Sequence, residues 1–599
     1  MIGTLHGPWL ILAALLFAGL AAVRGRRPAT AEILLIAGIF AAGLALRLEF
    51  GVWGPLHVNG QGPLWVRGTL EPQALVGYGP GYFELFNWMT GLGRAPDRTV
   101  FVVNALLSAL SPTLLYATAR LIGLPRPSAL AAAVVLALDA VTIRTAASEG
   151  YYAPLIALVL GVQLSLGLAV VGHRQRNGFA AAAGLLGAGL FAAATARIHP
   201  MGYLPLALCP LVVLGAAGPT GLARRIGFAL AAATAIAATV VVTSIQTILT
   251  ALQASMAEHA VAPLTVHQLA FLLVLLAALW SIRHWSPLPW LPLLAVASLA
   301  LMLATQDSFQ EHPLQKLSYQ RLFWPGVFLG SAALLPPRRH SLIGAAALAT
   351  AAALFLLAPA YAHLGTPTTE QLEYRFLQEI LPMLPSGCTI AAVAHADRRV
   401  WEIPGYLAPA AAPGTIAAQR AVERDSDLNV APGDCLIYIR SSLCSSGEAR
   451  ALCDSLESSA KLERLASRVF PALPSFADLP YDRSQVETVV FRVTGRSATT
   501  NEAAPITPAL AQLLYDRLTP LRATDGCRVV RLDTGRYQVD LGMQDRSGRE
   551  HKVELATNAS DEGAGRRVGG WRVSHSAETQ AGCPDTLAGI ERLLGELGK

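Results

Sequence analysis

Residues 152–171 read YAPLIALVLGVQLSLGLAVV, twenty residues without a charged side chain. A helix that crosses the hydrocarbon core of a bilayer needs about 20 mostly apolar residues. Over the whole chain of 599 residues, 53% are hydrophobic and only 14% are charged, whereas roughly 25% of the residues of a soluble protein are charged. The sequence therefore predicts a protein that spans a membrane.

Similar apolar runs fill the first 365 residues. We distinguish about twelve by length and composition. They lie near residues 7–23, 31–48, 99–119, 127–143, 152–171, 178–196, 200–217, 226–249, 268–282, 287–305, 322–337 and 341–362. We expect residues 1–365 to form a polytopic α-helical membrane domain, in which the first run is either a signal anchor or an ordinary span.

Positive charge recurs in every second connection between these runs. Lys and Arg are enriched in the cytoplasmic loops of membrane proteins, so we expect these connections to face the cytoplasm, most simply across a bacterial inner (plasma) membrane. The residues are Arg24, Arg26, Arg27, Arg120, Arg126, Arg174, Arg176, Arg224, Arg225, Arg283, Arg338 and Arg339. They explain much of the net charge of +6, and no basic face with interleaved aromatics indicates a nucleic-acid partner. The other loops and the C-terminal region are then extracytoplasmic.

Six of the seven cysteines lie after residue 366. An even number in a soluble region favours disulfides and an oxidising compartment, which agrees with the orientation derived from the arginines. Six cysteines allow 15 connectivities. Of these we predict Cys388–Cys435, Cys444–Cys453 and Cys527–Cys583. Zinc binding is the alternative, although no CxxC or CxxH spacing supports it.

The C-terminal region is predicted to form two soluble domains. Residues 366–497 begin with an amphipathic helix over 366–385, and the apolar runs that start at Cys388, Cys435 and Val486 predict buried strands of a small α/β domain. Residues 498–599 predict a small α+β domain with a helix, a hairpin near residues 533–536, further strands and a closing helix. Neither part contains a known catalytic motif, so we expect them to bind glycan or protein, or to cover the membrane site.

Unusual polar residues gather in the loops expected outside. The first and longest of these loops, residues 49–98, carries Glu49, His57 and Asn59 among several aromatic residues. Later loops add Arg144, Glu149, Tyr151, Arg197, His199, Lys316 and Arg321. Charged groups at the edge of hydrocarbon are costly unless they pair or line a cavity. We therefore predict a shared cavity for those at the ends of the spans (Glu49, Arg144, Glu149, Arg197 and His199), whereas residues farther out in the loops can simply be solvated. Asp139, inside an apolar run, is expected to pair with Arg144 or with another span.

Four pieces of sequence on this face resemble the GT-C superfamily of polytopic glycosyltransferases, in the branch of the protein O-mannosyltransferases and the lipid A aminoarabinose transferases. They are LRL at 46–48, YGPGYFELF at 78–86, RTAASEGYYAPL at 144–155 and ATARIHP at 194–200. These pieces are similar to the end of the first conserved span, the return from the first outer loop, the second outer loop and a short His-Pro turn. Together they cover about residues 31–220.

The resemblance implies transfer of a sugar from a polyprenyl-phosphate-linked donor to a glycan, lipid or protein acceptor at the outer membrane surface. Such transfer needs a carboxylate that takes the proton of the acceptor and cations that neutralise the departing phosphate. We assign the catalytic role to Glu49, His57 and Glu149. The predicted substrate-binding residues are Asn59, Arg144, Tyr151, Arg197, His199, Lys316 and Arg321.

The first loop departs from the pattern of the superfamily. Those enzymes commonly have an Asp-Glu pair where this chain reads HVNGQGP at 57–63. The base is then Glu49, Glu71 or His57, unless the chemistry has diverged. Asn59 and His57 alone would be poor ligands for Mg²⁺ or Mn²⁺, which prefer carboxylate oxygens. We assign no cofactor, and a divalent metal stays an open alternative.

Two other functions fit parts of the pattern. A transporter or flippase for a lipid-linked sugar is expected to show internal repeats and polar residues at the middle of the membrane, and here the ionisable groups gather at one face. A non-catalytic assembly factor that has the same fold would explain the missing Asp-Glu pair. Of the three functions, that of a glycosyltransferase accounts for most of the polar residues in the outer loops.

Overall fold

The computed structural model describes most of the chain in separate stretches. These are residues 7–24, 30–51, 53–54, 81–82, 84–85, 96–216, 221–258, 290–306, 320–333, 367–393, 416–422, 428, 434–445, 447–472, 484–496, 508–521, 524–534, 538–556, 566–568 and 571–597. The chain divides into two compact units, residues 1–454 with 462–495 and residues 455–461 with 496–599. Each unit is described by itself.

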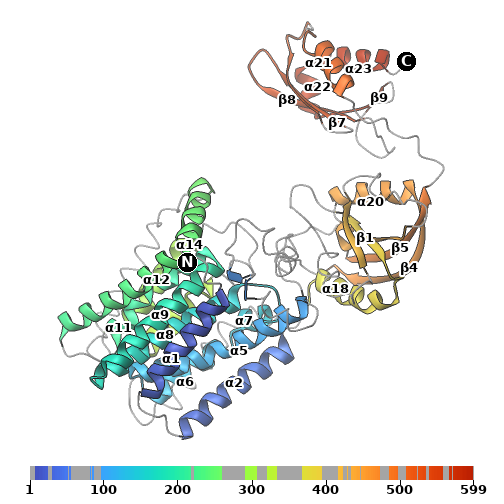
Figure 1. The fold of residues 1–599 in the computed structure, drawn as a ribbon. Helices are drawn as coiled ribbons and strands as arrows, with labels where there is room; N and C mark the ends of the chain where they lie inside the picture. The colour runs from blue at the N-terminus through green and yellow to red at the C-terminus, as the bar shows by residue number, and fades with distance from the viewer. Residues whose placement is uncertain are drawn as a thin grey trace. The chain divides into compact units, whose positions relative to one another are not determined.

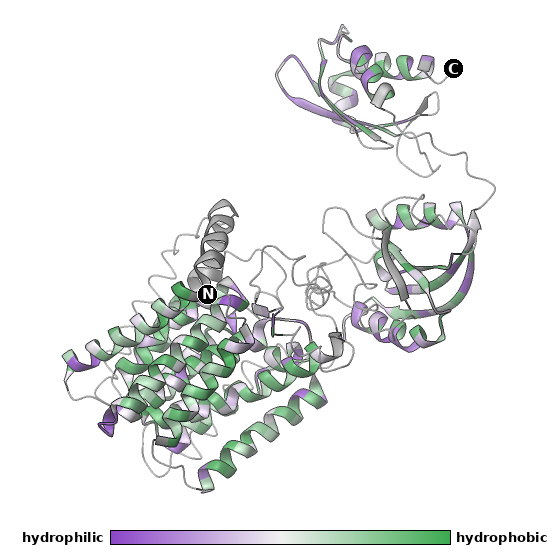
Figure 2. Ribbon diagram, in the orientation of Figure 1, coloured by the Kyte–Doolittle hydropathy of each residue, from purple (hydrophilic) through white to green (hydrophobic). Residues whose placement is uncertain are grey.

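Apolar helices make up the N-terminal part of the first unit (Figures 1 and 2). They are α1 (Gly7–Arg24), α2 (Thr30–Phe50), α5 (Pro96–Ile122), α6 (Arg126–Ala137), α7 (Ala140–Thr145), α8 (Tyr152–Arg174), α9 (Gly178–Ile198), the 3₁₀ turn η3 (Pro200–Gly202), α10 (Tyr203–Leu208), α11 (Pro210–Gly215), α12 (Leu222–Glu258), α14 (Pro292–Gln306) and α16 (Trp324–Ala332).

Five stretches of helix within the described residues are long and apolar enough to cross a membrane. They are Thr30–Phe50, Thr99–Ile122, Tyr152–Arg174, Gly178–Ile198 and Leu222–Val242. Shorter apolar helices lie at Pro8–Val23, Arg126–Ala137, Tyr203–Gly215 and Pro292–Met302. The protein is therefore a helical membrane protein, as predicted, but the number of twelve spans is not established. The runs predicted at 268–282 and 341–362 lie outside the described residues.

Two predicted spans are broken helices. The run at 127–143 is divided where α6 ends and Asp139 caps α7, because the Asp139 carboxylate accepts a hydrogen bond from the Thr142 N–H at 3.0 Å. The run at 200–217 is divided into α10 and α11 at Cys209 and Pro210. Hydropathy does not detect such breaks, because the residues that flank them are apolar.

Helix α9 packs against α1, α8 and α12. Its sequence is rich in Gly and Ala, which lets neighbouring backbones approach closely, as is common between membrane helices. At Gly184 an added Cβ would lie 2.6 Å from the backbone nitrogen of Ala169 in α8, so only glycine fits there. Small residues thus determine the packing of this helix.

Arginines of the predicted cytoplasmic connections gather at one end of the helices. Glu32, at the start of α2, forms ion pairs with Arg120 at the end of α5 and with Arg126 at the start of α6, each at 2.7 Å. The opposite end, where α2 ends and both α5 and α8 begin, is called the loop end below. The predicted site residues that are described lie towards this loop end.

The first unit also contains a five-stranded mixed sheet with strand order β2-β1-β3-β5-β4. Strand β1 pairs in parallel with β2 and β3, and β3 pairs antiparallel with β5. The elements are α18 (Thr369–Ile380), η4 (Leu381–Met383), β1 (Cys388–Val393), β2 (Ile416–Val422), β3 (Leu436–Arg440), η6 (Ser442–Ser445), α20 (Gly447–Ser459), β4 (Ala460–Pro471) and β5 (Gln485–Arg496). The predicted helix and three strands are confirmed; β2 and β4 were not predicted.

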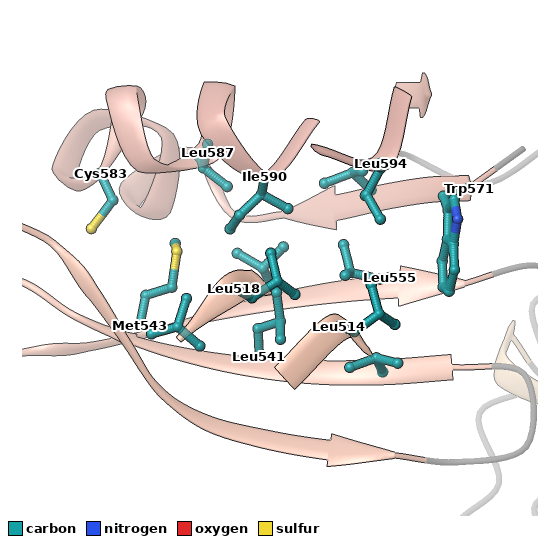
Figure 3. Packing of buried hydrophobic residues seen from close by; sticks show 14 of the residues in the cluster. Leu514, Leu518, Leu541, Met543, Leu555, Trp571, Cys583, Leu587, Ile590 and Leu594 are labelled. Carbon is teal, nitrogen blue, oxygen red and sulfur yellow. The ribbon is translucent and has the colours of Figure 1, made fainter. Parts of the chain in front are cut away.

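The second unit has an antiparallel sheet with strand order β6-β7-β8-β10-β9. Its elements are α21 (Pro508–Leu518), β6 (Arg528–Thr534), β7 (Gln538–Gln544), β8 (Glu550–Ala556), β9 (Arg566–Val568), β10 (Trp571–His575), α22 (Ala577–Gly582) and α23 (Pro584–Leu597). Figure 3 shows Leu587, Ile590 and Leu594 of α23 pointing towards Leu541 and Leu555 of the sheet, all in one buried cluster. The order of helix, hairpin, strands and closing helix agrees with the prediction.

All three predicted disulfides are present. Cys388 is bonded to Cys435, Cys444 to Cys453 and Cys527 to Cys583. Cys209 is buried and has a free thiol. The first two bonds lie in the mixed sheet domain and the third lies in the second unit, so each sheet is fixed covalently.

Candidate active site at the loop end of the helices

Asn104 of α5 fixes the short loop between α7 and α8. Its Nδ2 donates to the carbonyl oxygens of Ser148 at 2.7 Å and of Gly150 at 2.9 Å. These two carbonyls flank Glu149, whose side chain is completely buried. The loop is therefore rigid around the carboxylate, and Glu149 is directed into the protein.

Two further contacts join this loop to the first predicted outer loop. The Tyr82 hydroxyl donates to the carbonyl oxygen of Glu149, and the Gly54 N–H donates to the carbonyl oxygen of Ala147 at 3.2 Å. The loop motifs that indicated a common face thus meet in the structure. Of the predicted site residues in this region, His57 and Asn59 lie outside the described residues, as does Lys316 of the later loop.

The two predicted catalytic carboxylates differ in exposure. Glu49 lies in the last turn of α2 and is exposed. Glu149 is 0% exposed. An exposed carboxylate can reach an acceptor hydroxyl directly, whereas a buried one acts on its protein surroundings. Glu49 is thus the more accessible base of the two.

Two aromatic side chains next to this loop are stacked on each other. The rings of Tyr151 and His199 are parallel within 7°, with their centroids 4.1 Å apart. His199 accepts the Met201 N–H at Nδ1, at 3.1 Å. Burial lowers the pKa of His199 to about 3 because a charged ring would lose its hydration. The imidazole is neutral at pH 7, and since Nδ1 accepts, its proton is carried on Nε2.

Arg197, at the end of α9, forms an ion pair with Glu84, and both side chains are largely buried. The chain around Glu84 lies directly on α9, since a Cβ on Gly81 would be 2.7 Å from the Cβ of Arg197. Arg197 therefore fastens the return of the first outer loop to the end of α9. This contact joins two of the motif pieces of the sequence.

Asp139 pairs with Arg321, just before α16, and so with the end of another apolar run rather than with Arg144, the other partner that was predicted. The guanidinium Nε lies 3.1 Å from both carboxylate oxygens, and a terminal nitrogen lies 2.9 Å from Oδ1. Arg321 also lies over the ring of Trp324, 5.1 Å from its centroid. The pair is buried and links the break before α7 to the segment that begins α16.

Arg47 is completely buried in α2. Its guanidinium donates to Ser108 Oγ at 2.7 Å, to the carbonyl oxygens of Gly43 and Ala137 at 3.1 and 3.2 Å, and to Thr142 Oγ1 at 3.4 Å. All of these acceptors are neutral.

Arg47 and Arg321 line one narrow cavity of about 10 Å³, together with Ser108, Thr145 and Tyr152. This volume accommodates about one water molecule. The cavity has two cationic and several hydroxyl side chains, so it is suited to an anionic group only if the surrounding helices separate.

Two residues of this region were not singled out from the sequence. Arg47 was used only as part of a motif, and Asn104 was missed. A lone Arg or Asn within an apolar run is the signal that could have identified both.

The cavity predicted to be shared by five charged residues stays a prediction, and the structure gives the places of two further members at the loop end. Arg144 is buried in the last turn of α7, and Arg197 is occupied by Glu84. Among the described residues there is no group of three or more His, Cys, Asp or Glu that could hold a metal ion.

Comparison with known proteins finds similarity to solved structures alone. No family model matches the chain, and no curated protein matches it. Among solved structures, the protein O-mannosyltransferase complex of S. cerevisiae bound to the sugar donor matches with 16% identity and a TM-score of 0.29, over 38% of this chain and 35% of that chain. The Archaeoglobus fulgidus oligosaccharyltransferase matches in its complex with Zn and sulfate (12% identity, TM-score 0.39, 84% and 79% of the chains) and in its apo form (11%, 0.40, 84% and 80%).

The S. cerevisiae protein is a protein O-mannosyltransferase by name, as is one of the branches with which the loop motifs were compared. The match to it spans about a third of its length. At identities of 11–16%, the function of this chain has to be argued from its own residues.

Proposed function

We propose that this chain is a membrane glycosyltransferase that transfers a sugar from a polyprenyl-phosphate-linked donor to a glycan, lipid or protein acceptor at the outer surface of the membrane. One observation carries the proposal: a rigid loop holds Glu149 between two hydrogen bonds from Asn104 at the end of the helices where Glu49 is exposed. Buried arginines lie towards the same end.

In this proposal Glu49 takes the proton of the acceptor hydroxyl. General-base catalysis by a positioned carboxylate contributes about 10²–10⁴-fold to a rate. His57 stays the alternative base in the same loop. Glu149 is buried, so its part is to hold the loop and the surrounding donors in place. No step of the proposal uses a metal.

Cations at the loop end would receive the phosphate of the donor. We propose Arg144 and Arg321 for this role. Arg321 would share its donors between the phosphate and Asp139, and Arg47 lines the same narrow cavity. Guanidinium groups bind phosphate with charge-assisted and often bidentate hydrogen bonds. Tyr151 and His199 are stacked on each other beside the loop and are buried, so their proposed contact with the sugar requires the loop to move. Asn59, Lys316 and Arg197 complete the proposed set.

We infer the orientation of the protein from two features. The arginine-rich connections lie at the end opposite the loop end, and three disulfides tie the soluble domains. Disulfides persist in oxidising compartments. The soluble domains, 366–497 and 498–599, are therefore proposed to be extracytoplasmic, with the protein in a bacterial plasma membrane.

A second candidate function is transport of a lipid-linked sugar. The break between α6 and α7, at which Asp139 meets Arg321 inside the helical part, resembles the discontinuous helices that bind substrate in transporters. A transporter would move the donor across vesicle membranes without consuming it. Measurement of whether the donor is consumed therefore distinguishes a glycosyltransferase from a transporter.

The test uses the purified full-length protein with labelled polyprenyl-phosphate sugars and membrane or cell-wall acceptors. We expect Glu49→Gln to reduce turnover about a hundredfold or more, and Glu49→Asp to retain part of it. Glu149→Gln is expected to reduce turnover and the thermal midpoint together. Glu596→Gln, at an exposed position of α23, is the matched control and should leave turnover unchanged.

Normal turnover in both Glu49→Gln and Glu149→Gln would disprove the assignment of the carboxylates. Absence of turnover by the unaltered protein with every donor would instead favour the non-catalytic assembly factor or, if labelled lipid moves between leaflets, the transporter.

A further inference from the structure

Helix α18, at the start of the mixed sheet domain, is buried on its polar side as well as on its apolar side. An amphipathic helix at a protein surface normally leaves its polar residues in water. In α18, however, the side chains of Thr369, Glu370, Gln371, Glu373 and Tyr374 are at most 2% exposed. Other parts of the protein therefore cover this side of the helix.

Hydrogen bonds fix α18 to the mixed sheet. The Glu373 carboxylate accepts the N–H and the hydroxyl of Ser442 at 2.8 and 2.7 Å, and the hydroxyl of Thr488 at 2.6 Å. The Thr369 hydroxyl donates to the carbonyl oxygen of Pro471, at the end of β4, at 3.0 Å. Helix α18 is therefore a fixed part of the sheet domain.

Two side chains of α18 also contact the loop end of the helices. The ring of Tyr374 packs edge-on against Phe101 of α5, with the centroids 6.2 Å apart and the planes at 72°. Gly54 of the first outer loop lies against the same helix. A Cβ at Gly54 would be 3.4 Å from Cγ of Gln371 and 3.8 Å from Cδ1 of Tyr374. The sheet domain thus contacts both α5 and the start of the first outer loop.

The segment that carries Glu49 is fixed at two points. On one side Arg47 is buried, and its carbonyl oxygen accepts the N–H of Gly51 at 3.0 Å. A Cβ on Gly51 would clash with that oxygen, so only glycine fits there. On the other side Gly54 donates to the loop around Glu149 and lies against α18. Loss of the contact with α18 would leave the second point held by one hydrogen bond of the backbone.

We propose that Tyr374 and Gln371 are positioning residues, which hold the first outer loop at Gly54 and so orient Glu49 for proton transfer. They act through the loop and not on the substrate. The inference rests on the proposed function, in which Glu49 is the base. It gives the mixed sheet domain a part in the reaction, because a catalytic group displaced by about 1 Å can lose about 10²-fold in rate.

The first experiment tests the contact itself and needs no turnover. In the full-length protein with Gly54→Cys and Gln371→Cys, the two Cβ atoms would be 3.6 Å apart, within the range of about 3.5–4.5 Å that a disulfide spans. We expect the bond to form, as shown by mass spectrometry of the linked peptides. Gly54→Cys with Arg375→Cys, at an exposed position of α18, is the control and should stay unlinked.

The second experiment tests the positioning role with labelled donor. Tyr374→Ala should lower kcat about tenfold or more and leave the KM of the donor nearly unchanged, whereas Tyr374→Phe, which keeps the ring, should retain most of the activity. Tyr515→Ala, at a tyrosine of α21 that is 49% exposed, is the matched control and should have no effect. The thermal midpoint of each variant identifies any loss of fold.

A rescue separates positioning from a general effect on stability. When Tyr374→Ala is combined with the oxidised Gly54→Cys and Gln371→Cys pair, the disulfide holds the loop in place of the ring. We expect kcat to return to most of the value of the oxidised pair alone. Loss of kcat that the disulfide does not restore would show that Tyr374 acts on the fold and not through the loop.

Other results would also overturn the proposal. Failure of the Gly54→Cys and Gln371→Cys pair to link would disprove the contact, and normal kcat in Tyr374→Ala would disprove the positioning role. Absence of turnover by the unaltered protein with every donor would disprove the proposed function, and the positioning role with it. The disulfide would then still show whether α18 holds the loop, so the two failures are distinguishable.

Discussion

The helical part and the C-terminal unit place apolar and charged residues in opposite ways. In the C-terminal unit Leu541, Leu555 and Ile590 are completely buried, while charged pairs such as Lys552 with Asp540 lie on the sheet surface. In the helical part Leu34 is 68% exposed, yet Arg47 is completely buried. Water drives the first arrangement, and lipid permits the second because exposed apolar side chains are solvated by lipid chains.

This comparison shows which contacts determine each part. The sheet unit depends on the fit of its apolar core. The helical part depends on small residues between helices and on a few polar contacts inside them. Substitutions that remove the same chemical group should therefore have different effects in the two parts.

The largest effect is expected from Asp139→Asn. It leaves Arg321 buried without the carboxylate that it pairs with. Breaking a buried ion pair costs about 3–5 kcal/mol. The thermal midpoint of the purified protein should fall strongly, and the double variant Asp139→Asn with Arg321→Gln should recover part of the loss. A double variant that is as unstable as the sum of both single variants would show that the pair is not coupled.

The next effect is expected from Leu541→Ala in β7. Leu541 is completely buried in the core of the C-terminal unit, and Leu→Ala in a core costs about 2–5 kcal/mol. Denaturation followed by the near-UV signal and by limited proteolysis should show loss of this unit alone. Val530→Ala, at a side chain that is 48% exposed, is the control and should change stability by less than about 0.5 kcal/mol.

A smaller effect, which depends on pH, is expected from Glu373→Gln in α18. Burial raises the pKa of Glu373 to about 7, more than the hydrogen bonds from Ser442 and Thr488 lower it, and Glu370 raises it further. The pKa is higher in the folded state than the usual value of 4.5. Below pH 4.5 the carboxyl is protonated in both the folded and the unfolded state, and the protein has its full stability. As the pH rises from 4.5 to 7, the unfolded state loses the proton first, and stability is lost. The loss is about 1.4 kcal/mol per pH unit.

The measurement for Glu373 is the difference in unfolding free energy between the unaltered protein and the Gln variant, as a function of pH. Glutamine does not titrate, so the difference should change between pH 4.5 and 7 and be constant above about pH 7. A difference that is independent of pH throughout would show that Glu373 keeps its ordinary pKa.

The smallest effect is expected from Leu34→Ala in α2. The substitution is the same as Leu541→Ala, but the side chain faces outward, where lipid fills the space that is vacated. We expect a change within about 0.5 kcal/mol. A loss as large as that of Leu541→Ala would mean that this face of α2 packs against protein, and the comparison above would then fail for that helix.

Sequence reasoning was most successful where one local signal decides the structure. The apolar runs predicted the helices, the cysteines of the soluble part predicted all three disulfides, and the apolar run at Cys388 predicted β1. It missed β4, whose residues alternate poorly between buried and exposed positions. It also predicted one span where Asp139 divides two helices, because a single polar residue scarcely changes the hydropathy of its surroundings.

The candidate site was predictable only in part. The motifs placed Glu49, Arg144, Glu149 and His199 at one face, but not their partners. Residues far apart in the sequence supply those partners, as Glu84 does for Arg197 and Asn104 does for the loop around Glu149. Such pairings follow from helix packing, and no local pattern encodes them.

The contact between Asp139 and Arg321 also has a consequence for biogenesis. The two residues are 182 positions apart in the chain, and chains are synthesised at about 5–20 residues per second. Asp139 therefore leaves the ribosome about 10–40 s before its partner. During that time the carboxylate must be held by its own cap on α7, by Arg47 or by the insertion machinery. The helical part can close only after the segment before α16 has arrived, so its assembly cannot be complete until Arg321, little more than half-way along the 599 residues, has been made.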